Sequence, residues 1–375
     1  MTIRKQPADF RVREVLVDAE SGPFPLYELT KESLTTPEAI AKLARALAIS
    51  AADCAYAGLK DKHALTTQSV TVRAEGQSLP EQVGEDRWSA RRVGSRSQPL
   101  SARDIARNEF EIILRDLTRE SSDAMDAAAA QLRVGDSLRV LNFFGDQRFG
   151  SARHGEGFAA RFLVRGEFEQ ALRLLIATPH RKDTGVQRAF TRTLANAWGD
   201  WPTLARDLPR CPNRRAIELL ASRATPGPSD FKDAFASLPY MLQEIAVDAY
   251  QSFLWNLILE KGAASDSSSL VGSKVALPSP SATYNAPFAD AASEVFANDG
   301  TAPADLRIPG LRRPAFRHAD RAAVVEASQF TMLPPQPDEL APPRGRKAPP
   351  RFQRTARFSL PSGSYATVVL RALGH

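Results

Sequence analysis

Apolar and polar residues alternate in several short segments of the chain, which is the pattern of strands that bury one face. Residues 10–16 (FRVREVL) alternate in this way, and so do residues 109–115 (EFEIILR). The apolar run CAYAGL at 54–59 favours a buried strand, and QSVTVRA at 68–74 predicts the next strand. The polar segment between these runs, KDKHALTT, predicts a loop at the rim of a sheet.

Other segments have the period of helices. A helix is expected to open at Thr36, where a hydroxyl cap precedes a proline and an acid. Residues 122–134 are alanine-rich and predict a helix, as do residues 159–176. An amphipathic helix is predicted by six apolar residues at helical spacing, Leu242, Ile245, Ala246, Ala249, Phe253 and Leu257.

Two basic segments lack such a pattern. Residues 91–107 carry several arginines and are predicted to be irregular. Residues 334–351 form a proline-rich connector that includes Arg344, Arg346 and Lys347. Both segments fit either solvated loops or strips that contact a polyanion.

The composition excludes several classes of protein. The chain has 375 residues, of which 43% are hydrophobic, so it can form a core. Its net charge of +6 fits a polyanionic partner or ordinary solubility. The two cysteines and five histidines show no ligand spacing, so no metal is expected, and no other cofactor is expected either. Without a signal or membrane-length run, a soluble cytoplasmic protein with no membrane contact is expected.

One acid, Asp61, stands between two lysines in the predicted loop. Taken alone, this sequence is typical of a turn aspartate that pairs with a neighbouring lysine. The surrounding segment YAGLKDKHALTTQ, however, is similar to the G-x-K-D-x-x-A-x-T-x-Q signature of the TruD family of pseudouridine synthases. The signature positions are Gly58, Lys60, Asp61, Ala64, Thr66 and Gln68.

Four further segments resemble the same family, in the same order along the chain. They are DFRVRE, NFFGDQRFG, AYQSFLWN and LPSGSYATVVLR. The resemblance implies an α+β fold with a mixed, mostly antiparallel pseudouridine synthase sheet, flanking helices and an inserted, largely helical TRUD domain. It implies a catalytic domain formed by residues 1–155 and 331–375, and the inserted domain at 156–330. One departure is Arg107, which stands where the family usually has glycine.

The resemblance also implies the activity. The chain would isomerise a uridine of tRNA, at position 13 in the family, with Asp61 as the catalytic residue and without a cofactor. The carboxylate would attack C1′ of the ribose or remove a proton from C2′, and the sequence leaves both routes open. Both routes start from an ionised carboxylate, which needs a cation or hydrogen-bond donors nearby. Arg4, Lys5, Lys60 and Lys62 are candidates.

Substrate contacts are implied at four positions, Phe10, Asn142, Phe144 and Phe358. Aromatic faces can hold a flipped base, and an amide can pair with the edge of uracil. Each phenylalanine could instead pack in the core, and Asn142 could serve a turn. Phe358 is expected to face a cleft.

Two further pairs of polar residues belong to the matching segments. Gln147 and Arg148 could bind phosphate or hold their loop. Ser252 and Asn256 lie one helical turn apart, and they could face a cleft or support packing. No obligate protein partner is implied, and the expected partner is tRNA or another structured RNA.

Two other functions compete with this interpretation. The first is a catalytically silent protein of the same fold that binds structured RNA. Asp61 and Asn142, which are both present, argue against it. The second is a nucleoside N-glycosylase, which normally needs a second carboxylate as acid or base, and none is expected beside Asp61.

Overall fold

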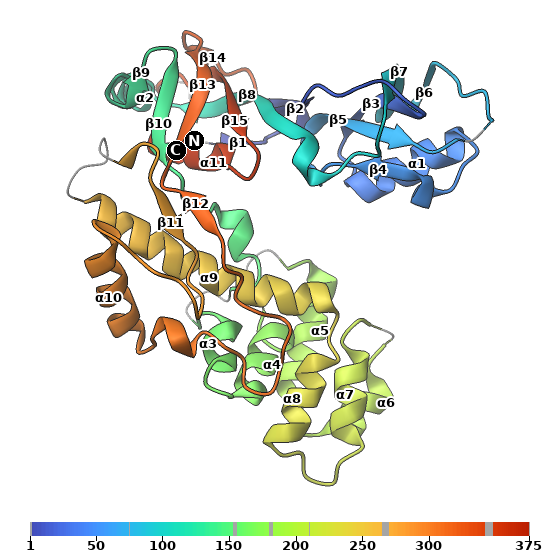
Figure 1. Cartoon of the computed structure of the whole chain (residues 1–375), viewed down its shortest axis with the longest axis vertical. Coiled ribbons are helices and arrows are strands. Elements are labelled where there is room, and N and C mark those ends of the chain that lie inside the picture. The colour runs from blue at the N-terminus through green and yellow to red at the C-terminus, as the bar shows by residue number, and fades with distance from the viewer. Residues whose placement is uncertain are drawn as a thin grey trace. The chain divides into compact units, whose positions relative to one another are not determined.

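The computed structural model describes residues 2–74, 76–152, 156–179, 183–209, 211–264, 270–341 and 348–374. The chain divides into two compact units (Figure 1). Unit 1 consists of Met1–Val140 together with Val325–His375, and unit 2 is the segment Leu141–Val324. Unit 1 therefore combines the two ends of the chain.

Unit 1 is built on one large mixed sheet. Its strands are β1 (Thr2–Ile3), β2 (Phe10–Leu16), β3 (Phe24–Glu32), β4 (Cys54–Tyr56), β5 (Leu65–Val72), β6 (Gln82–Glu85), β7 (Trp88–Arg96), β8 (Ile105–Leu117), β9 (Arg133–Val134), β10 (Ser137–Leu141), β13 (Val324–Met332), β14 (Gln336–Pro337) and β15 (Phe352–Pro361). They follow the order β6-β7-β3-β5-β2-β8-β15-β13-β10-β9, while β1, β4 and β14 pair beside this path. β2 and β5 are parallel, and the other neighbours of described register are antiparallel.

Helices cover one face of this sheet at two places. They are α1 (Thr36–Ala46), α2 (Arg119–Leu132) and α11 (Ala366–Ala372). α2 and α11 bury Met125 and Val369 in one core cluster with Ile112 of β8. α1 buries Leu43 in a second cluster with Val70 of β5. The strand register places both clusters on the same face of the sheet. Ile112 of β8 pairs with Phe10 of β2, and steps of two residues along β2 and β5 from this pair lead to Val70.

The stretch of this face between the two clusters is polar. Side chains alternate along a strand, so Glu14, Lys31, Gln68 and Asn108 point to the same face as the core residues. The register pairs Glu14 with Asn108, and it pairs Lys31 with Thr66. Glu14, Lys31 and Gln68 are buried, and buried polar groups need hydrogen-bond partners. The loop at 57–64 supplies several of them.

Unit 2 is largely helical and surrounds one long helix, α9 (Tyr240–Ala263) (Figure 1). Its other helices are α3 (Ala159–Leu163), α4 (Phe168–Ile176), α5 (Gly185–Asn196), α6 (Trp201–Asp207), α7 (Arg214–Ala221), α8 (Pro228–Ala236) and α10 (Phe288–Asp299). Two short strands, β11 (Lys274–Ala276) and β12 (Asp320–Ala322), pair antiparallel. Tyr250 and Trp255 of α9 are completely buried.

The α+β architecture and several elements predicted from the sequence are confirmed. The alternating segment 10–16 is β2, and the segment 109–115 lies within β8. Residues 122–132 belong to α2. The loop that carries Asp61 does lie between two strands, β4 and β5.

Three local predictions are wrong in part. Residues 91–107 are irregular only from 97 to 104, because Arg91–Arg96 continue β7 and residues 105–107 begin β8. The cap of α1 is Thr35, whose side chain accepts a hydrogen bond from the Glu38 amide, rather than Thr36. Residues 159–176 form two helices, α3 and α4, separated by Gly166 with a φ of 74°.

The amphipathic stripe predicted along α9 is also wrong. Ile245, a member of the stripe, is 36% exposed, whereas Gln251 and Ser252 outside it are buried. The helix is enclosed on several sides by unit 2, so its polar residues are buried as well. Ser252 and Asn256 accordingly bind neighbouring groups in the same unit.

The proline-rich segment 334–351 is more than a connector. Its Asp338 is buried, and Oδ1 lies 2.9 Å from Nη1 of Arg115 in β8. Arg115 also pairs with Asp9 at 2.7 Å. Burial opposes ionisation of Asp9, but hydrogen bonds from Arg115 and the Gln6 backbone hold its pKa below the ordinary value. Arg344, Arg346 and Lys347 lie outside the described residues.

Candidate active site

Asp61 stands in the loop that joins β4 to β5. Its side chain is 33% exposed, and its Oδ2 lies 2.6 Å from Nη2 of Arg4. The guanidinium stabilises the negative charge on this carboxylate. An ionised carboxylate that is partly open to solvent can act as a nucleophile or as a base.

Arg4 approaches Asp61 from an uncommon backbone conformation. Its φ is 67°, in the left-handed region that costs an ordinary residue about 1–2 kcal/mol. The guanidinium lies over the ring of Phe10, with 4.0 Å from Cζ to the ring centroid. Arg4 thus brings together Asp61 and Phe10, two residues singled out from the sequence.

The lysines on either side of Asp61 pair with other acids. Lys60 Nζ lies 2.6 Å from Oε2 of Glu14 and 3.1 Å from Oδ1 of Asn108. The Lys60 and Glu14 side chains are 8% and 0% exposed, so this is a buried ion pair that ties the loop to β2. Lys62 is exposed, 3.8 Å from Glu38, and such pairs contribute about 0–1 kcal/mol.

Side chains from the sheet and from α1 hold the backbone of the loop. Thr36 Oγ1 accepts a hydrogen bond from the Lys60 amide at 3.0 Å. The same hydroxyl donates to Oε1 of Gln68 at 2.9 Å. Lys31 Nζ donates to the carbonyl oxygen of Asp61 at 3.0 Å. The backbone around Asp61 is therefore fixed from two elements.

Glu14 and Lys31 were not singled out from the sequence as site residues. In the strands FRVREVL and FPLYELTKE, every second residue faces inward. Glu14 and Lys31 stand at such inward positions, where the neighbouring inward residues are apolar. That break in the pattern was the available signal, because charged residues are rarely buried unless they are paired.

The phenylalanines expected at the substrate pack against one another in unit 1. Phe110 of β8 lies between Phe10 and Phe358, with ring centroids 6.2 Å and 5.5 Å away. Phe358 also stacks on Phe330 at 6.4 Å. Phe10 and Phe358 are 3% and 2% exposed and belong to the core. Phe358 is also among the residues that line the cavity described below, so the expectation that it faces a cleft stays a prediction.

Asn142 lies in unit 2, where both ends of its side-chain amide are engaged. Nδ2 donates to the carbonyl oxygen of Ala322 at 3.0 Å. Oδ1 accepts a hydrogen bond from Nη2 of Arg321 at 2.7 Å, and Arg321 Nε also donates to the Asn142 carbonyl. These bonds tie the loop after β10 to β12.

Phe144 lies in the same cluster of unit 2. Arg321 stacks on its ring with Cζ 4.2 Å from the centroid, and Trp255 meets the ring edge-on at 5.4 Å. Asn256 accepts from the Phe144 amide at 2.8 Å and donates to its carbonyl at 3.0 Å. The role of Arg321 was not predicted from the sequence, because Arg321 lies far from Phe144 along the chain.

Gln147 and Arg148 belong to the short helix that follows Phe144. Gln147 is exposed. Arg148 pairs with Asp248 at 3.0 Å and donates to Oγ of Ser252 at 3.2 Å. Of its two expected roles, this geometry favours holding the loop over binding phosphate.

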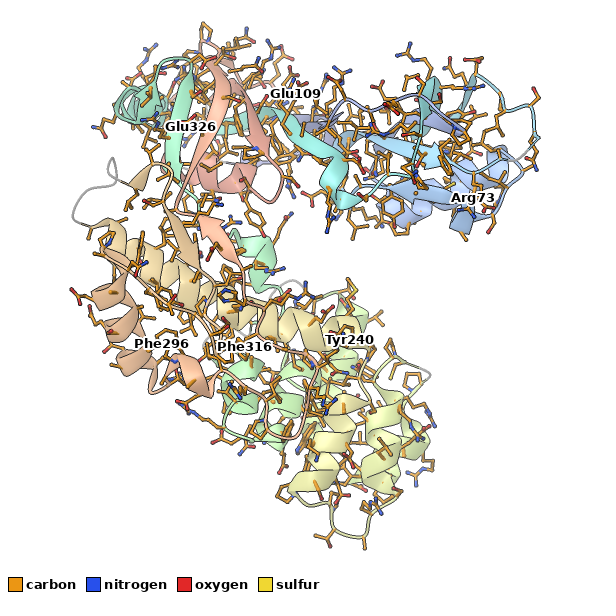
Figure 2. All side chains as sticks on the ribbon, viewed as in Figure 1. Arg73, Glu109, Tyr240, Phe296, Phe316 and Glu326 are labelled. Carbon is orange, nitrogen blue, oxygen red and sulfur yellow. The ribbon has the colours of Figure 1, made fainter. Side chains whose placement is uncertain are left out.

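A cavity of about 520 Å³ opens on the opposite face of the unit 1 sheet. Its charged lining residues are Arg11, Arg13, Glu109, Glu111 and Arg357; Figure 2 labels Glu109. Arg11 and Arg357 both pair with Glu111, at 3.7 Å and 2.8 Å. Asp61 does not line this cavity, so the site around Asp61 is a separate feature.

Within the described ranges, no three His, Cys, Asp or Glu side chains gather as a metal site would require. In the same part of the chain, no helix is long and apolar enough to cross a membrane.

Comparison with known proteins bears directly on this site. A family model described as tRNA pseudouridine synthase D (TruD) matches residues 1–279, which include the Asp61 loop and the Asn142 segment. The chain belongs to the TruD family. Membership favours a catalytic enzyme, an isomerase, over a silent RNA-binding protein of the same fold.

Individual relatives agree with the TruD assignment. The tRNA pseudouridine synthase D of Aquifex aeolicus is 26% identical over 400 residues, covering 99% of this chain and 97% of the relative. A probable tRNA pseudouridine synthase D of Methanococcus maripaludis is 29% identical over 268 residues. That match covers 70% of this chain and 66% of the relative.

A solved structure has the same fold. It is the crystal structure of a Methanosarcina mazei protein described as tRNA pseudouridine synthase D (TruD), with a TM-score of 0.75. The match covers 99% of this chain and 92% of the other, at 24% sequence identity. The TruD fold therefore extends over nearly the whole chain.

Proposed function

We propose that this TruD protein converts a uridine of tRNA to pseudouridine and that Asp61 performs the chemistry. The observation that carries the proposal is the Asp61 carboxylate, 33% exposed and 2.6 Å from Arg4, in the loop that matches the TruD signature. The resemblance implies the uridine at position 13. A tRNA-modifying enzyme would act in the cytoplasm.

The reaction is an isomerisation and needs no co-reactant. The bond from N1 to C1′ breaks, the uracil turns, and a bond from C5 to C1′ forms. The proton that leaves C5 is balanced by the proton that N1 gains. Asp61 starts this sequence by attacking C1′ or by removing the C2′ proton, and Arg4 binds and orients the carboxylate.

We assign the two parts of the family's architecture to the two units. Unit 1 would be the catalytic domain, because it carries Asp61 and both chain ends. Unit 2 would be the inserted TRUD domain. The domain boundaries expected from the sequence, 1–155, 156–330 and 331–375, stay a proposal. Substrate contact by Phe10, Asn142, Phe144 and Phe358 rests on the resemblance in the same way.

The RNA partner is supported by an exposed basic stretch of unit 2, residues 306–317, which we call the arginine segment. Leu306, Ile308 and Phe316 are buried and anchor it; Phe316 is labelled in Figure 2. The ring of Phe316 meets that of Tyr250 of α9 edge-on, with 6.2 Å between the centroids. Arg312 and Arg313 between these anchors are exposed. Neither forms an ion pair with a described residue, which leaves both available to phosphate.

An exposed aromatic ring lies beside the arginine segment. Tyr240, at the start of α9, is 45% exposed (Figure 2). Partial burial and Glu244 raise the pKa of its hydroxyl, while the charges of Arg313 and Arg317 oppose that rise, so these arginines lie near the ring. An exposed ring among arginines suits an unpaired base and its phosphates.

The basic strips expected from the sequence are less suited to this role. Arg91 and Arg92 of β7 lie 3.9 Å from Glu28 and Glu81, respectively. Arg96 makes a closer pair with Asp104 at 3.1 Å. Paired arginines have less charge to offer to phosphate.

The glycosylase alternative needs a second carboxylate at the reacting sugar. Among the described residues, the acids paired with the lysines that flank Asp61 are Glu14, whose side chain is 0% exposed, and Glu38, which lies 3.8 Å from Lys62. Both acids are held in ion pairs with these lysines, whereas a glycosidase uses its second carboxylate as acid or base at the glycosidic bond.

Unmodified tRNA transcripts provide the test. The protein is incubated with a set of transcripts, and pseudouridine is located by carbodiimide-dependent stops of reverse transcriptase. We expect one strong new stop at a single uridine in a subset of transcripts. Absence of any stop in all transcripts, with binding intact, would contradict the proposed activity.

A further inference from the structure

Lys31 of β3 is a charged residue in an apolar position. It is 0% exposed and points to the same face as Tyr27 and Leu29, which are also 0% exposed. The alternation of β3 would accept methionine or leucine here, and a buried ammonium is costly unless it is paired.

No carboxylate neutralises Lys31 by direct contact among the described residues. Its Nζ donates to three backbone carbonyls, those of Leu34 at 2.7 Å, Asp61 at 3.0 Å and Lys60 at 3.4 Å. An ammonium has three donors, so these three acceptors match its capacity. Glu14 is already held by Lys60.

The three carbonyls belong to two segments. Leu34 precedes α1, whereas Lys60 and Asp61 form the loop between β4 and β5. A single buried ammonium therefore joins the catalytic loop to the start of α1. Desolvation lowers the pKa of Lys31 to about 8, although the nearby charge of Asp61 opposes this.

We propose that Lys31 is a positioning residue that orients Asp61 by binding the carbonyl oxygens of Lys60 and Asp61. The inference rests on the proposed function, because it matters only if Asp61 acts on the ribose. The Lys60 carbonyl precedes the Asp61 amide nitrogen, and the Asp61 carbonyl follows its Cα. Hydrogen bonds from Lys31 to both carbonyls therefore fix the backbone conformation of Asp61. The side chain of Asp61 then leaves the loop at one angle, where Arg4 meets it.

The first test compares Lys31→Met with the wild type. Methionine fills the same volume and removes the three donors. We expect the rate constant of pseudouridine formation at saturating tRNA to fall about 10²-fold, as for a misplaced catalytic group. The dissociation constant for tRNA should change less than twofold, and the melting temperature should not fall.

Lys42→Met is the matched control. Lys42 of α1 is a partly exposed lysine that pairs with Glu85 at 2.8 Å, away from the Asp61 loop. The Lys42→Met variant should form pseudouridine at the wild-type rate. A rate for Lys31→Met within threefold of wild type would overturn the proposal.

Hydrogen exchange provides a readout that does not depend on activity. In Lys31→Met, amides in the peptide covering 58–62 should exchange at least tenfold faster, while peptides of β8 stay unchanged. Unchanged exchange at 58–62 overturns the positioning role. If wild type is inactive on tRNA but the exchange difference appears, the proposed function fails and the structural role of Lys31 stands.

Lys31→Gln covers the case in which Lys31→Met does not fold. Glutamine keeps two N–H donors, one bond closer to the backbone than the lysine Nζ, and carries no charge. We expect an intermediate rate and intermediate exchange at 58–62. If both variants fold, equal behaviour would overturn the assignment of the effect to these hydrogen bonds. If only Lys31→Gln folds, wild-type exchange at 58–62 together with a wild-type rate would overturn it.

Discussion

Arg4 and Asp61 are joined across 57 residues of sequence by one short contact of 2.6 Å. The sequence offered four cations for this role, Arg4, Lys5, Lys60 and Lys62. The geometry selects Arg4 as an ion-pair partner, because Lys60 and Lys62 pair with Glu14 and Glu38. This selection depends on the left-handed backbone at Arg4, and a residue pattern does not reveal such a conformation.

Arg4→Gln should separate catalysis from stability. Arginine and glutamine have the same backbone cost at a φ of 67°, so Arg4→Gln removes only the charge and the contacts of the guanidinium. We expect the single-turnover rate to fall on the order of 10²-fold. The free energy of unfolding should change by about 1 kcal/mol or less, because the pair is partly exposed.

Arg11→Gln serves as the control for Arg4→Gln. Arg11 is also near the N-terminus, but it pairs with Glu111 on the opposite sheet face. Its single-turnover rate should equal that of wild type. A normal rate for Arg4→Gln would show that the ion pair with Asp61 has no catalytic role.

Phe358 is a residue whose role is decided by comparing two substitutions. Its ring is 2% exposed between Phe110 and Phe330, so Phe358→Ala should lower the free energy of unfolding by about 3–5 kcal/mol. Phe358→Leu keeps most of the volume and should cost less than about 1.5 kcal/mol. Urea unfolding measures both values.

The activity of Phe358→Leu then tests the contact implied by the family. Loss of the aromatic face should lower the rate by more than its small loss of stability explains. Full activity in Phe358→Leu would show that Phe358 serves packing alone.

At the scale of elements, the sequence predicted the strands that alternate cleanly and missed those that do not. β2 was predicted because its alternation is regular. β7 was missed because Arg91 and Arg92 stand at adjacent positions, which conceals the buried residues Trp88 and Ala90. β7 is defined by a long-range pairing with β3, together with a local hairpin with β6.

The polar stretch of the sheet was predictable only in part. The loop with Asp61 was located from its motif, but its supports were not. Lys31 and Glu14 are buried because the loop folds over them and supplies partners. That enclosure depends on tertiary structure, so composition and spacing could not indicate it.

Lys31 gives unfolding a specific pH dependence. Its pKa is about 8 in the folded chain and 10.5 without burial, while Asp61, Lys60 and Glu38 are the charged groups that act on it. Between these values the unfolded chain binds more protons, so stability rises with pH. Between pH 7 and pH 9.5, deprotonation of Lys31 should raise the free energy of unfolding by about 2 kcal/mol.

Urea unfolding of wild type and Lys31→Met at both pH values isolates this contribution. The free energy of unfolding of wild type minus that of Lys31→Met should increase by about 2 kcal/mol from the lower to the higher pH. A difference that is independent of pH would mean that Lys31 is not buried as a charged group.

At the scale of the whole molecule, two segments far apart in sequence make one sheet. β15 of the C-terminal segment pairs with β8, and Arg115 joins Asp9 to Asp338. The resemblance to the family implied a catalytic domain formed by both ends of the chain, and that assignment stays a proposal. The arginine segment was not anticipated, because its exposure depends on anchors such as Phe316 that only the fold of unit 2 defines.

Binding to tRNA should depend on the arginine segment through counterion release. Replacing Arg312 and Arg313 together with Gln should lower the slope of log affinity against log salt by about 1.5. The rate at saturating tRNA should stay near wild type, because Arg312 and Arg313 belong to unit 2, whereas Asp61 and its supporting side chains belong to unit 1. Filter binding over a range of salt concentrations measures the slope.

The control for charge is the double variant Arg206→Gln with Arg223→Gln. These arginines of unit 2 are also exposed, but they pair with Asp207 and Asp230. Their removal should change the slope less. If the two double variants give the same slope, the arginine segment is a solvated surface.

The central claim is that Asp61 performs the isomerisation, and Asp61→Asn tests it most directly. Asparagine keeps the size of the side chain but can neither attack C1′ nor remove the C2′ proton. The measurement is single-turnover pseudouridine formation with excess enzyme, alongside binding of the same tRNA. We predict binding within a few-fold of wild type and no pseudouridine above background. Pseudouridine formation by Asp61→Asn at a rate near that of wild type would contradict the account.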